Sequence, residues 1–164
     1  MTRANVIRTV EHVDLQSYLG KWYEIARFDS WFERNCVNVT AEYSLLEHGV
    51  IGVYNSCRVG TPLGKYKSVS GRAIVVDTRS NAKLKVSFLP RILSCFDRFF
   101  SGDYWILKVA SDYSVALVGD PSRNYLWILS RTPTLAPDIY NQYVESALQL
   151  GFDVKKLKTT QQQN

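Results

Sequence analysis

Hydrophobic and polar residues alternate with a period of two along most of the chain, the pattern of β-strands that turn one face toward a core. Near the middle, Leu84, Val86 and Phe88 fall on one face, while Lys83, Lys85 and Ser87 fall on the other. Turn residues interrupt the alternation at short intervals. The pattern predicts eight strands, over Trp22–Arg27, Val39–Leu45, Val50–Cys57, Lys67–Val76, Lys83–Phe88, Tyr104–Val109, Val115–Val118 and Tyr125–Ser130. Strands of this number and spacing are typical of an up-and-down barrel or a sandwich.

One helix is predicted after the last strand, over about residues 135–150. Thr134 can cap it, Pro137 suits its first turn, and Gly151 can end it. The apolar stripe at helical spacing comprises Ile139, Tyr140, Tyr143, Val144, Ala147 and Leu148. We therefore expect one all-β domain over residues 1–164: an eight-stranded antiparallel up-and-down barrel, about residues 20–131, with the helix packed on its wall.

Composition narrows the function classes. The 164 residues are 46% hydrophobic, and no apolar run reaches the roughly 18 residues that span a bilayer. The net charge of +5 suggests nucleic acid, but the basic residues are scattered and only Lys155, Lys156 and Lys158 cluster. We therefore expect no nucleic-acid partner. Three cysteines without zinc spacing and two distant histidines predict no metal and no cofactor.

Three short motifs resemble those of the lipocalin family. Gly20–Arg27 (GKWYEIAR) resembles the G-x-W motif of the first strand, and Ser111-Asp112-Tyr113 is similar to the T-D-Y motif with Ser for Thr. Leu129–Pro133 (LSRTP) carries an Arg that closes the last strand. The longer matches look most like the group of bacterial lipocalins, plant temperature-induced lipocalins and apolipoprotein D.

The resemblance implies structural roles for the motif residues. The narrow lumen of an eight-stranded barrel needs a plug at its closed end, and Trp22 would supply it. Arg131 would lie across the indole as a cation–π partner, with Asp112 and Tyr113 in the adjacent turn. Gly20 opens the first strand. We interpret these residues as keystones of the fold rather than catalysts.

Strand alternation then predicts the residues that line the lumen. If Trp22 points inward, every second residue of the same strand also points into the lumen, and the same alternation holds on each other strand. Val53 would join them, and the resemblance adds Tyr104 and Ile106, although Lys108 shares their parity. Small alanines among polar side chains favour a partly hollow interior over a solid core. The candidate ligand-binding residues are Glu24, Ala26, Val39, Ala41, Tyr43, Asn55, Leu84, Val86, Phe88, Tyr104, Ile106, Tyr125, Trp127 and Leu129.

Four segments are expected at the open mouth: Asp29–Cys36, Arg58–Tyr66, Leu89–Asp103 and Asp120–Asn124. Leu89–Phe100 is unusually apolar for a loop, which leaves three readings open: a lid, a membrane-surface contact or a self-association patch. An anionic head group would be favoured there by the basic residues of these loops, Arg58, Lys65, Arg91, Arg98 and Arg123.

No catalytic constellation is apparent. The two histidines are badly placed for a Ser-His-Asp triad, Glu24 lacks a partner carboxylate in the inward register, and Cys95 lacks a neighbouring base. We expect a binding protein rather than an enzyme, although a lipocalin-type enzyme stays open.

The expected function is binding, transport or storage of small hydrophobic ligands. The resemblance implies fatty acids or lysophospholipids, held by a monomer or homodimer. The alternative is a filled barrel that uses its apolar rim to contact protein or a membrane surface. The resembling bacterial proteins are lipoproteins of the outer membrane, so we expect an outer-membrane or periplasmic location if a leader was removed, and a cytoplasmic one otherwise.

The last expectation concerns Cys36 and Cys57. With a tight turn at His48-Gly49, Cys57 would oppose about Thr40, leaving Cys36 roughly 13 Å further along at 3.3 Å per residue. A disulfide tolerates only about 4.4–6.8 Å between Cα atoms. Without a bulge or a loop that folds back, we therefore expect three free thiols, Cys95 included.

Overall fold

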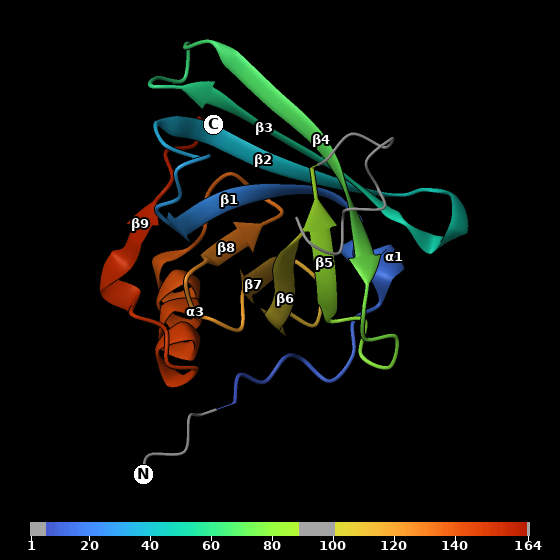
Figure 1. Ribbon diagram of the computed structural model, residues 1–164. Helices are drawn as coiled ribbons and strands as arrows, with labels where there is room; N and C mark the ends of the chain where they lie inside the picture. Colours follow the sequence, from blue (N-terminus) through green and yellow to red (C-terminus); the bar gives the residue numbers. More distant parts are fainter. Residues whose placement is uncertain (1–5, 89–100, 164) are drawn as a thin grey trace.

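The computed structural model describes residues 6–88 and 101–163, which form a closed antiparallel barrel with a helix on its outer wall (Figure 1). The strands follow the order β2-β3-β4-β5-β6-β7-β8-β1-β9, and an additional β1–β2 pairing closes the sheet. The predicted fold class is confirmed. The elements are α1 (Leu15–Tyr18), β1 (Gly20–Phe28), β2 (Cys36–Leu45), η1 (Glu47–Gly49), β3 (Ile51–Val59), β4 (Tyr66–Val75), β5 (Lys83–Ser87), β6 (Gly102–Val109), β7 (Val115–Gly119), β8 (Leu126–Ser130), α3 (Pro137–Gln149), η3 (Val154–Lys156) and β9 (Leu157–Thr159).

Two β-bulges reverse which side chains face inward. In β1, Glu24 pairs with Leu129 but Ala26 pairs with Ile128, so one extra residue is inserted at Ile25. In β6, the same irregularity lies between Ile106 and Lys108. A one-residue insertion moves every later side chain to the opposite face, because the period is two.

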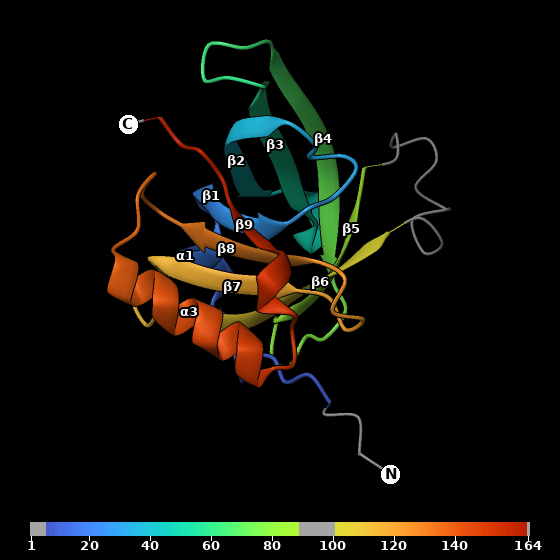
Figure 2. The ribbon, with the colours of Figure 1, turned by 90° about the vertical axis from the view of Figure 1, so that its left-hand side faces the viewer.

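Two hydrophobic clusters result, one inside the barrel and one outside. The inner cluster fills the closed end around Trp22, which is fully buried. The outer cluster lies between the sheet and α3, which runs along the outer side of β7 (Figure 2). Tyr143 and Ala147 are the buried helix positions, whereas Leu148 is exposed. The N-cap is Ala136 without a side-chain hydrogen bond, so the cap predicted at Thr134 is wrong; the helix begins directly at Pro137, which needs no donor partner.

Arg131 and Trp22 together seal the closed end. The guanidinium carbon lies 3.8 Å from the centroid of the Trp22 ring. The same guanidinium donates hydrogen bonds to the carbonyl oxygens of Lys21 at 2.8 Å, Ser17 at 2.8 Å and Leu19 at 2.9 Å. One side chain thus ties the short helix α1, which the sequence pattern missed, to the barrel floor.

Cys36 and Cys57 form a disulfide with 5.6 Å between their Cα atoms, so the expected free thiols at these two positions are wrong. Two register shifts explain the error. The turn contains η1, whose His48 has a positive φ, and the last hairpin pair is Leu45 with Ile51. A bulge between Val37 and Thr40 then removes one further position, so Cys36 pairs opposite Val59. Cys95 lies outside the described residues.

The C-terminal segment was also missed, because β9 has only three residues and no periodicity to detect. β9 pairs with the second half of β1, and the following residues run between β1 and β2. The backbone N–H of Asn38 donates to the carbonyl of Gln161, and the Gln162 amide donates to the carbonyls of Glu24 and Val39. The segment therefore bridges the two strands where they diverge.

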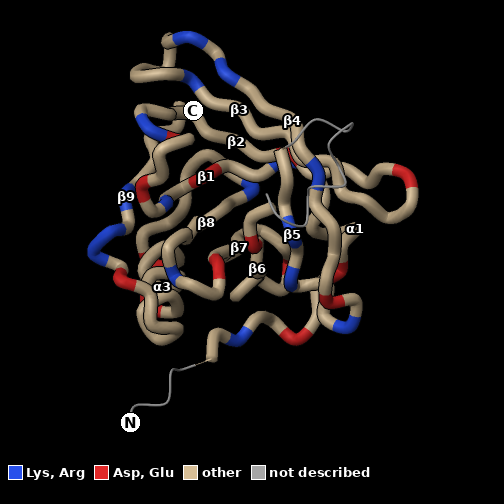
Figure 3. The backbone as a smooth tube through the Cα atoms, viewed as in Figure 1, with Lys and Arg blue, Asp and Glu red and all other residues tan. Residues whose placement is uncertain are grey.

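Charged residues of both signs are interspersed over the described fold (Figure 3). Within residues 6–88 and 101–163, no helix has the length and apolarity needed to cross a bilayer. The same residues contain no cluster of His, Cys, Asp or Glu suited to a metal ion.

Candidate functional site

The barrel encloses a cavity of about 440 Å³. Its rim residues come from three of the four predicted mouth segments, represented by Glu33, Ser101 and Asp120. The described lining residues are Glu24, Phe32, Glu33, Val39, Thr40, Ala41, Tyr43, Val53, Asn55, Val86, Phe88, Ser101, Gly102, Asp103, Tyr104, Asp120, Tyr125, Trp127 and Leu129. A volume of this size lies in the range of about 300–1,000 Å³ that holds small organic ligands.

All but three of the candidate ligand-binding residues line this cavity. Leu84 and Ile106 lie deeper, around a small void of about 10 Å³ beneath the main cavity. Ala26 is placed elsewhere: the β1 bulge turns it outward, where it is fully buried in the cluster beneath α3. The prediction for Ala26 is therefore wrong. Lys108 also faces outward and donates to Ser146 of α3 at 2.9 Å, which removes the conflict of its parity with Ile106.

Three hydrogen-bonded tyrosines form the floor between the cavity and the closed end. The Tyr104 hydroxyl lies 2.8 Å from that of Tyr18 and 2.9 Å from that of Tyr43. Burial raises the pKa of Tyr43 to about 12 and raises the pKa values of the other two well above the usual range. The hydroxyls stay neutral and satisfy one another, so the floor is compatible with an apolar ligand end.

A row of aromatic rings leads from the molecular surface into the cavity. Trp31 is 79% exposed and packs edge-on against Phe32. Phe32 lies 6.1 Å from Tyr125, whose ring stacks on Trp127 at 5.8 Å between centroids. The row provides continuous apolar surface from the solvent to the interior.

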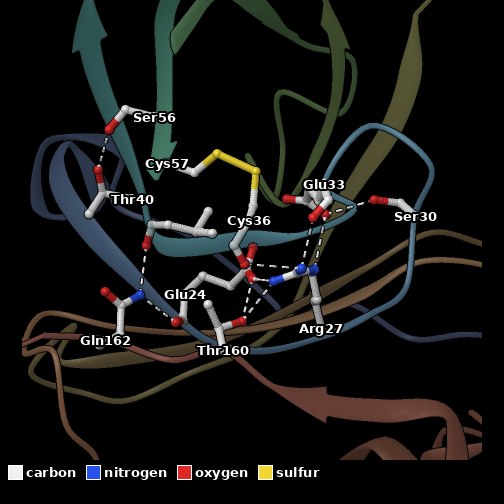
Figure 4. The surroundings of a disulfide bond; sticks show 11 residues. Glu24, Arg27, Ser30, Glu33, Cys36, Thr40, Ser56, Cys57, Thr160 and Gln162 are labelled. Atoms are coloured by element: carbon white, nitrogen blue, oxygen red, sulfur yellow. Dashed lines mark hydrogen bonds and ion pairs between the residues drawn. A yellow bond between two sulfur atoms is a disulfide. The ribbon is translucent and has the colours of Figure 1, made fainter. Parts of the chain in front are cut away.

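A buried ionic network lies beside the disulfide, at the wall formed by β1 and the first mouth segment (Figure 4). Arg27 contacts Glu24 at 2.6 Å and donates to Thr160 at 3.0 Å, so the C-terminal segment takes part. Its Nε lies 3.9 Å from Oε2 of Glu33, which also accepts hydrogen bonds from Ser30 Oγ and, at 3.3 Å, from Trp127 Nε1. Desolvation, reinforced by the negative charge of Glu24, raises the pKa of Glu33 to about 8.

Glu33 is the most important lining residue that the sequence analysis missed. It belongs to a loop, where strand parity says nothing about direction. Arg27 was missed because the β1 bulge turns it inward. The nearest sequence signal was the conjunction of Glu33 with Trp31 and Phe32, an unusually apolar stretch for a turn.

The basic residues expected at the mouth are engaged elsewhere or lie outside the described residues. Arg58 donates to the carbonyl of Gly64 and lies over the ring of Tyr66, while Arg123 donates to the carbonyl of Leu150. Lys65 is exposed and does not line the cavity. Arg91, Arg98 and the whole apolar segment Leu89–Phe100 fall in the part of the chain that is not described.

The sequence profile of the lipocalin-like domain matches residues 13–162. The chain belongs to the lipocalin family. Lipocalins are binding and transport proteins for small hydrophobic ligands, which agrees with a barrel that surrounds a cavity. The family also accounts for the order of the three motifs along the chain.

Curated lipocalins from three kingdoms are similar over nearly the whole chain. Temperature-induced lipocalin-1 of Arabidopsis thaliana is 41% identical over 99% of this chain and 86% of its own length. The outer membrane lipoprotein Blc of Escherichia coli K12 is 40% identical over 95% of this chain and 83% of its own. Mouse apolipoprotein D is 35% identical, covering 94% and 79%. The recognised lipocalin group is therefore confirmed.

Solved structures show the same fold at much lower sequence identity. Insecticyanin from the tobacco hornworm Manduca sexta superposes with a TM-score of 0.73 at 19% identity, covering 96% of this chain and 85% of that one. Lobster apocrustacyanin A1 gives a TM-score of 0.69 at 15% identity. These likenesses support the barrel architecture alone.

Proposed function

We propose that this lipocalin binds a single-chain lipid, a fatty acid or a lysophospholipid, with the acyl chain inside the barrel and the polar head at the mouth. The observation that carries the proposal is the 440 Å³ cavity, which ends at the floor of three hydrogen-bonded tyrosines, with Leu84 and Ile106 around the small void beneath. Transport or storage would follow from reversible binding. The proposal requires no catalytic group.

Chain length provides a quantitative test. Each buried methylene contributes about 0.8 kcal/mol, so removing four methylenes weakens binding by about 3 kcal/mol, roughly 100-fold. Displacement of a fluorescent fatty acid by acids of ten, fourteen and eighteen carbons measures this dependence. Native mass spectrometry of the purified protein reports retained lipid independently. If no single-chain lipid binds in either experiment, the proposed function is refuted.

A cavity-filling variant links binding to the lumen. Ala41 lines the cavity, so Ala41→Trp places an indole where the acyl chain would lie. Ser70→Trp is the matched control, because Ser70 is exposed and pairs with Tyr54, an exposed residue of β3. We expect Ala41→Trp to abolish binding and Ser70→Trp to retain it. Equal binding by both would place the lipid outside the barrel.

Contact with a membrane surface is a second candidate function, favoured by the aromatic rim. Trp31, at 79% exposure, and Phe32, at 43%, are exposed at the mouth in adjacent positions. Indole side chains favour the interface between lipid and water. Cosedimentation with phosphatidylglycerol vesicles, compared between the wild type and Trp31→Ala, tests this function.

We also propose an outer-membrane or periplasmic location. One support is that the similar Blc proteins of Vibrio cholerae and Escherichia coli are outer membrane lipoproteins. The other is the Cys36–Cys57 disulfide, because structural disulfides persist in oxidising compartments and are rare in the cytosol. Fractionation of the native host tests the location; recovery of reduced protein from the cytosol would contradict it.

A further inference from the structure

We infer that the head group received by this cavity is a cationic ammonium, held by the carboxyl group of Glu33 against the faces of Tyr125 and Trp127. This inference rests on the proposed lipid-binding function and narrows it. Among single-chain lipids it favours those with an amine or choline head over free fatty acids. Four observations on the cavity support it.

The first observation is the sign of the ionisable groups around the cavity. Its described lining residues include the acidic side chains Glu24, Glu33, Asp103 and Asp120, and no Lys, Arg or His. A carboxylate head entering this space would meet acidic groups and no basic side chain among the described lining residues. At short range such repulsion costs several kcal/mol wherever the local dielectric is low.

The second observation is that no described cation contacts the Glu33 carboxyl at hydrogen-bond distance. Asp103 pairs with Lys85 at 2.8 Å. Asp120 accepts hydrogen bonds from Ser122 and from the backbone N–H of Tyr125, within its own turn.

The other two acidic lining residues are Glu24 of β1 and Glu33 of the loop that follows β1. Glu24 is held by Arg27 at 2.6 Å. The guanidinium nitrogen nearest to the Glu33 carboxylate is Nε, 3.9 Å away without a hydrogen bond, while Nη2 donates to the backbone carbonyl of Glu33 at 2.8 Å. Two carboxyl groups therefore share one guanidinium. When both are ionised, one negative charge lacks a cation among the described residues, and a ligand ammonium would balance it.

The third observation is an unused acceptor on the same cavity. Oδ1 of Asn55 is buried without a hydrogen-bond partner among the described residues, and Asn55 lines the cavity. A buried acceptor left unpaired costs about 1–3 kcal/mol, so a ligand that donates a hydrogen bond is favoured. Ammonium and hydroxyl groups donate, whereas a carboxylate only accepts.

The fourth observation is the aromatic surface beside Glu33. The indole N–H of Trp127 donates to Glu33 at 3.3 Å, so the carboxyl lies at the edge of the ring, next to its faces. Tyr125 stacks parallel to Trp127, and Phe32 lies next to Tyr125. Aromatic faces attract ammonium groups, quaternary ones included, by about 0.5–2 kcal/mol each. A carboxylate bordered by aromatic rings combines both modes of cation recognition.

Proton linkage supplies a test that uses the unmodified protein. Burial and Glu24 raise the pKa of Glu33 to about 8, so the empty site holds a proton at pH 7. The groups that face Glu33 are Glu24 and Arg27 of β1 and Trp127 of β8, and Tyr43 contributes a neutral phenol. An ammonium that takes the place beside Glu33 would favour its ionised form, and the proton would leave to the buffer.

The experiment compares tetradecylamine, tetradecanol and tetradecanoic acid below their aggregation limits by isothermal titration calorimetry. We expect the amine to bind at least tenfold more tightly than the acid, and to release a proton at pH 7 that is detected in buffers of different ionisation enthalpy. The alcohol should bind without proton release. Myristoyl lysophosphatidylcholine against myristoyl lysophosphatidylethanolamine then distinguishes a quaternary from a primary ammonium source, and myristoyl lysophosphatidylglycerol is the control without an ammonium group.

Glu33→Gln keeps the size of the side chain and removes its charge. We expect it to reduce the preference for amine over alcohol at least tenfold, whereas Glu42→Gln, an exposed change on β2, should preserve it. Equal or tighter binding of the acid by the wild type, or an amine preference that survives Glu33→Gln, would overturn the inference while leaving lipid binding intact. Failure of all three ligands to bind would instead refute the proposed function.

Discussion

Arg131 offers the sharpest test of how this barrel is held closed. Its guanidinium lies over Trp22 and donates to carbonyl oxygens of Ser17, Tyr18, Leu19, Lys21 and Tyr113. A hydrogen bond to a charged group contributes about 1.5–3 kcal/mol, and a cation–π contact about 1–2 kcal/mol. Because this end of the barrel is partly open to water, several of the carbonyls can be rehydrated. We therefore expect Arg131→Met to lower the free energy of unfolding by about 3 kcal/mol.

Urea unfolding followed by tryptophan fluorescence measures this loss. With an m-value of about 2 kcal/mol/M, the midpoint should fall by about 1.5 M. Arg131→Lys keeps the charge but loses the planar fork, so it should recover less than half of the loss. Arg79→Met, at an exposed arginine, is the matched control and should change stability by less than about 0.5 kcal/mol. A loss below 1 kcal/mol for Arg131→Met would refute the interpretation of this residue as a keystone.

Three further perturbations follow from the wall beside the disulfide. Replacing Cys36 and Cys57 by Ser opens a loop with a sequence separation of 21 and should lower the free energy of unfolding in urea by about 3 kcal/mol. Thiol counting in denaturant should find one free thiol in the wild type. The free energy of unfolding of the wild type should fall as the pH rises from about 5 to 8, because the raised pKa of Glu33 lets the folded state keep a proton that the unfolded state loses. Thermal melts at stepped pH measure this dependence, and Glu33→Gln should flatten it. Thr160→Val removes a hydroxyl bonded to Arg27 and Glu24 and should cost about 1–2 kcal/mol, with unchanged unfolding contradicting a role for the C-terminal segment.

The sequence determined the architecture because its signals are local. Each strand shows alternation with a period of two, and an apolar stripe at 3.6-residue spacing predicts the helix. The positions of Trp22 and Arg131 in their motifs predicted a contact between residues more than a hundred positions apart. Most of the cavity lining followed from the same alternation, since a strand without a bulge keeps its parity to the end.

Only the tertiary structure decided the features that depend on register and on loops. The bulges at Ile25 and Leu107 leave no mark in the hydrophobic pattern, yet they turn Ala26 and Lys108 outward and Arg27 inward. The same cause brought Cys36 to Cys57, because two one-residue shifts in the hairpin shortened their offset along the ladder from four positions to two.

Glu33 and Thr160 show the same limit in segments without periodicity. Neither residue lies within a strand that sequence alternation could reveal, and each reaches Arg27 only because the folded barrel brings a loop and the C-terminal segment to one wall. The free energy that directs them there is the burial and pairing of charge, which depends on neighbours distant in sequence. The cavity is thus encoded locally, while the chemistry at its mouth is assembled by the fold.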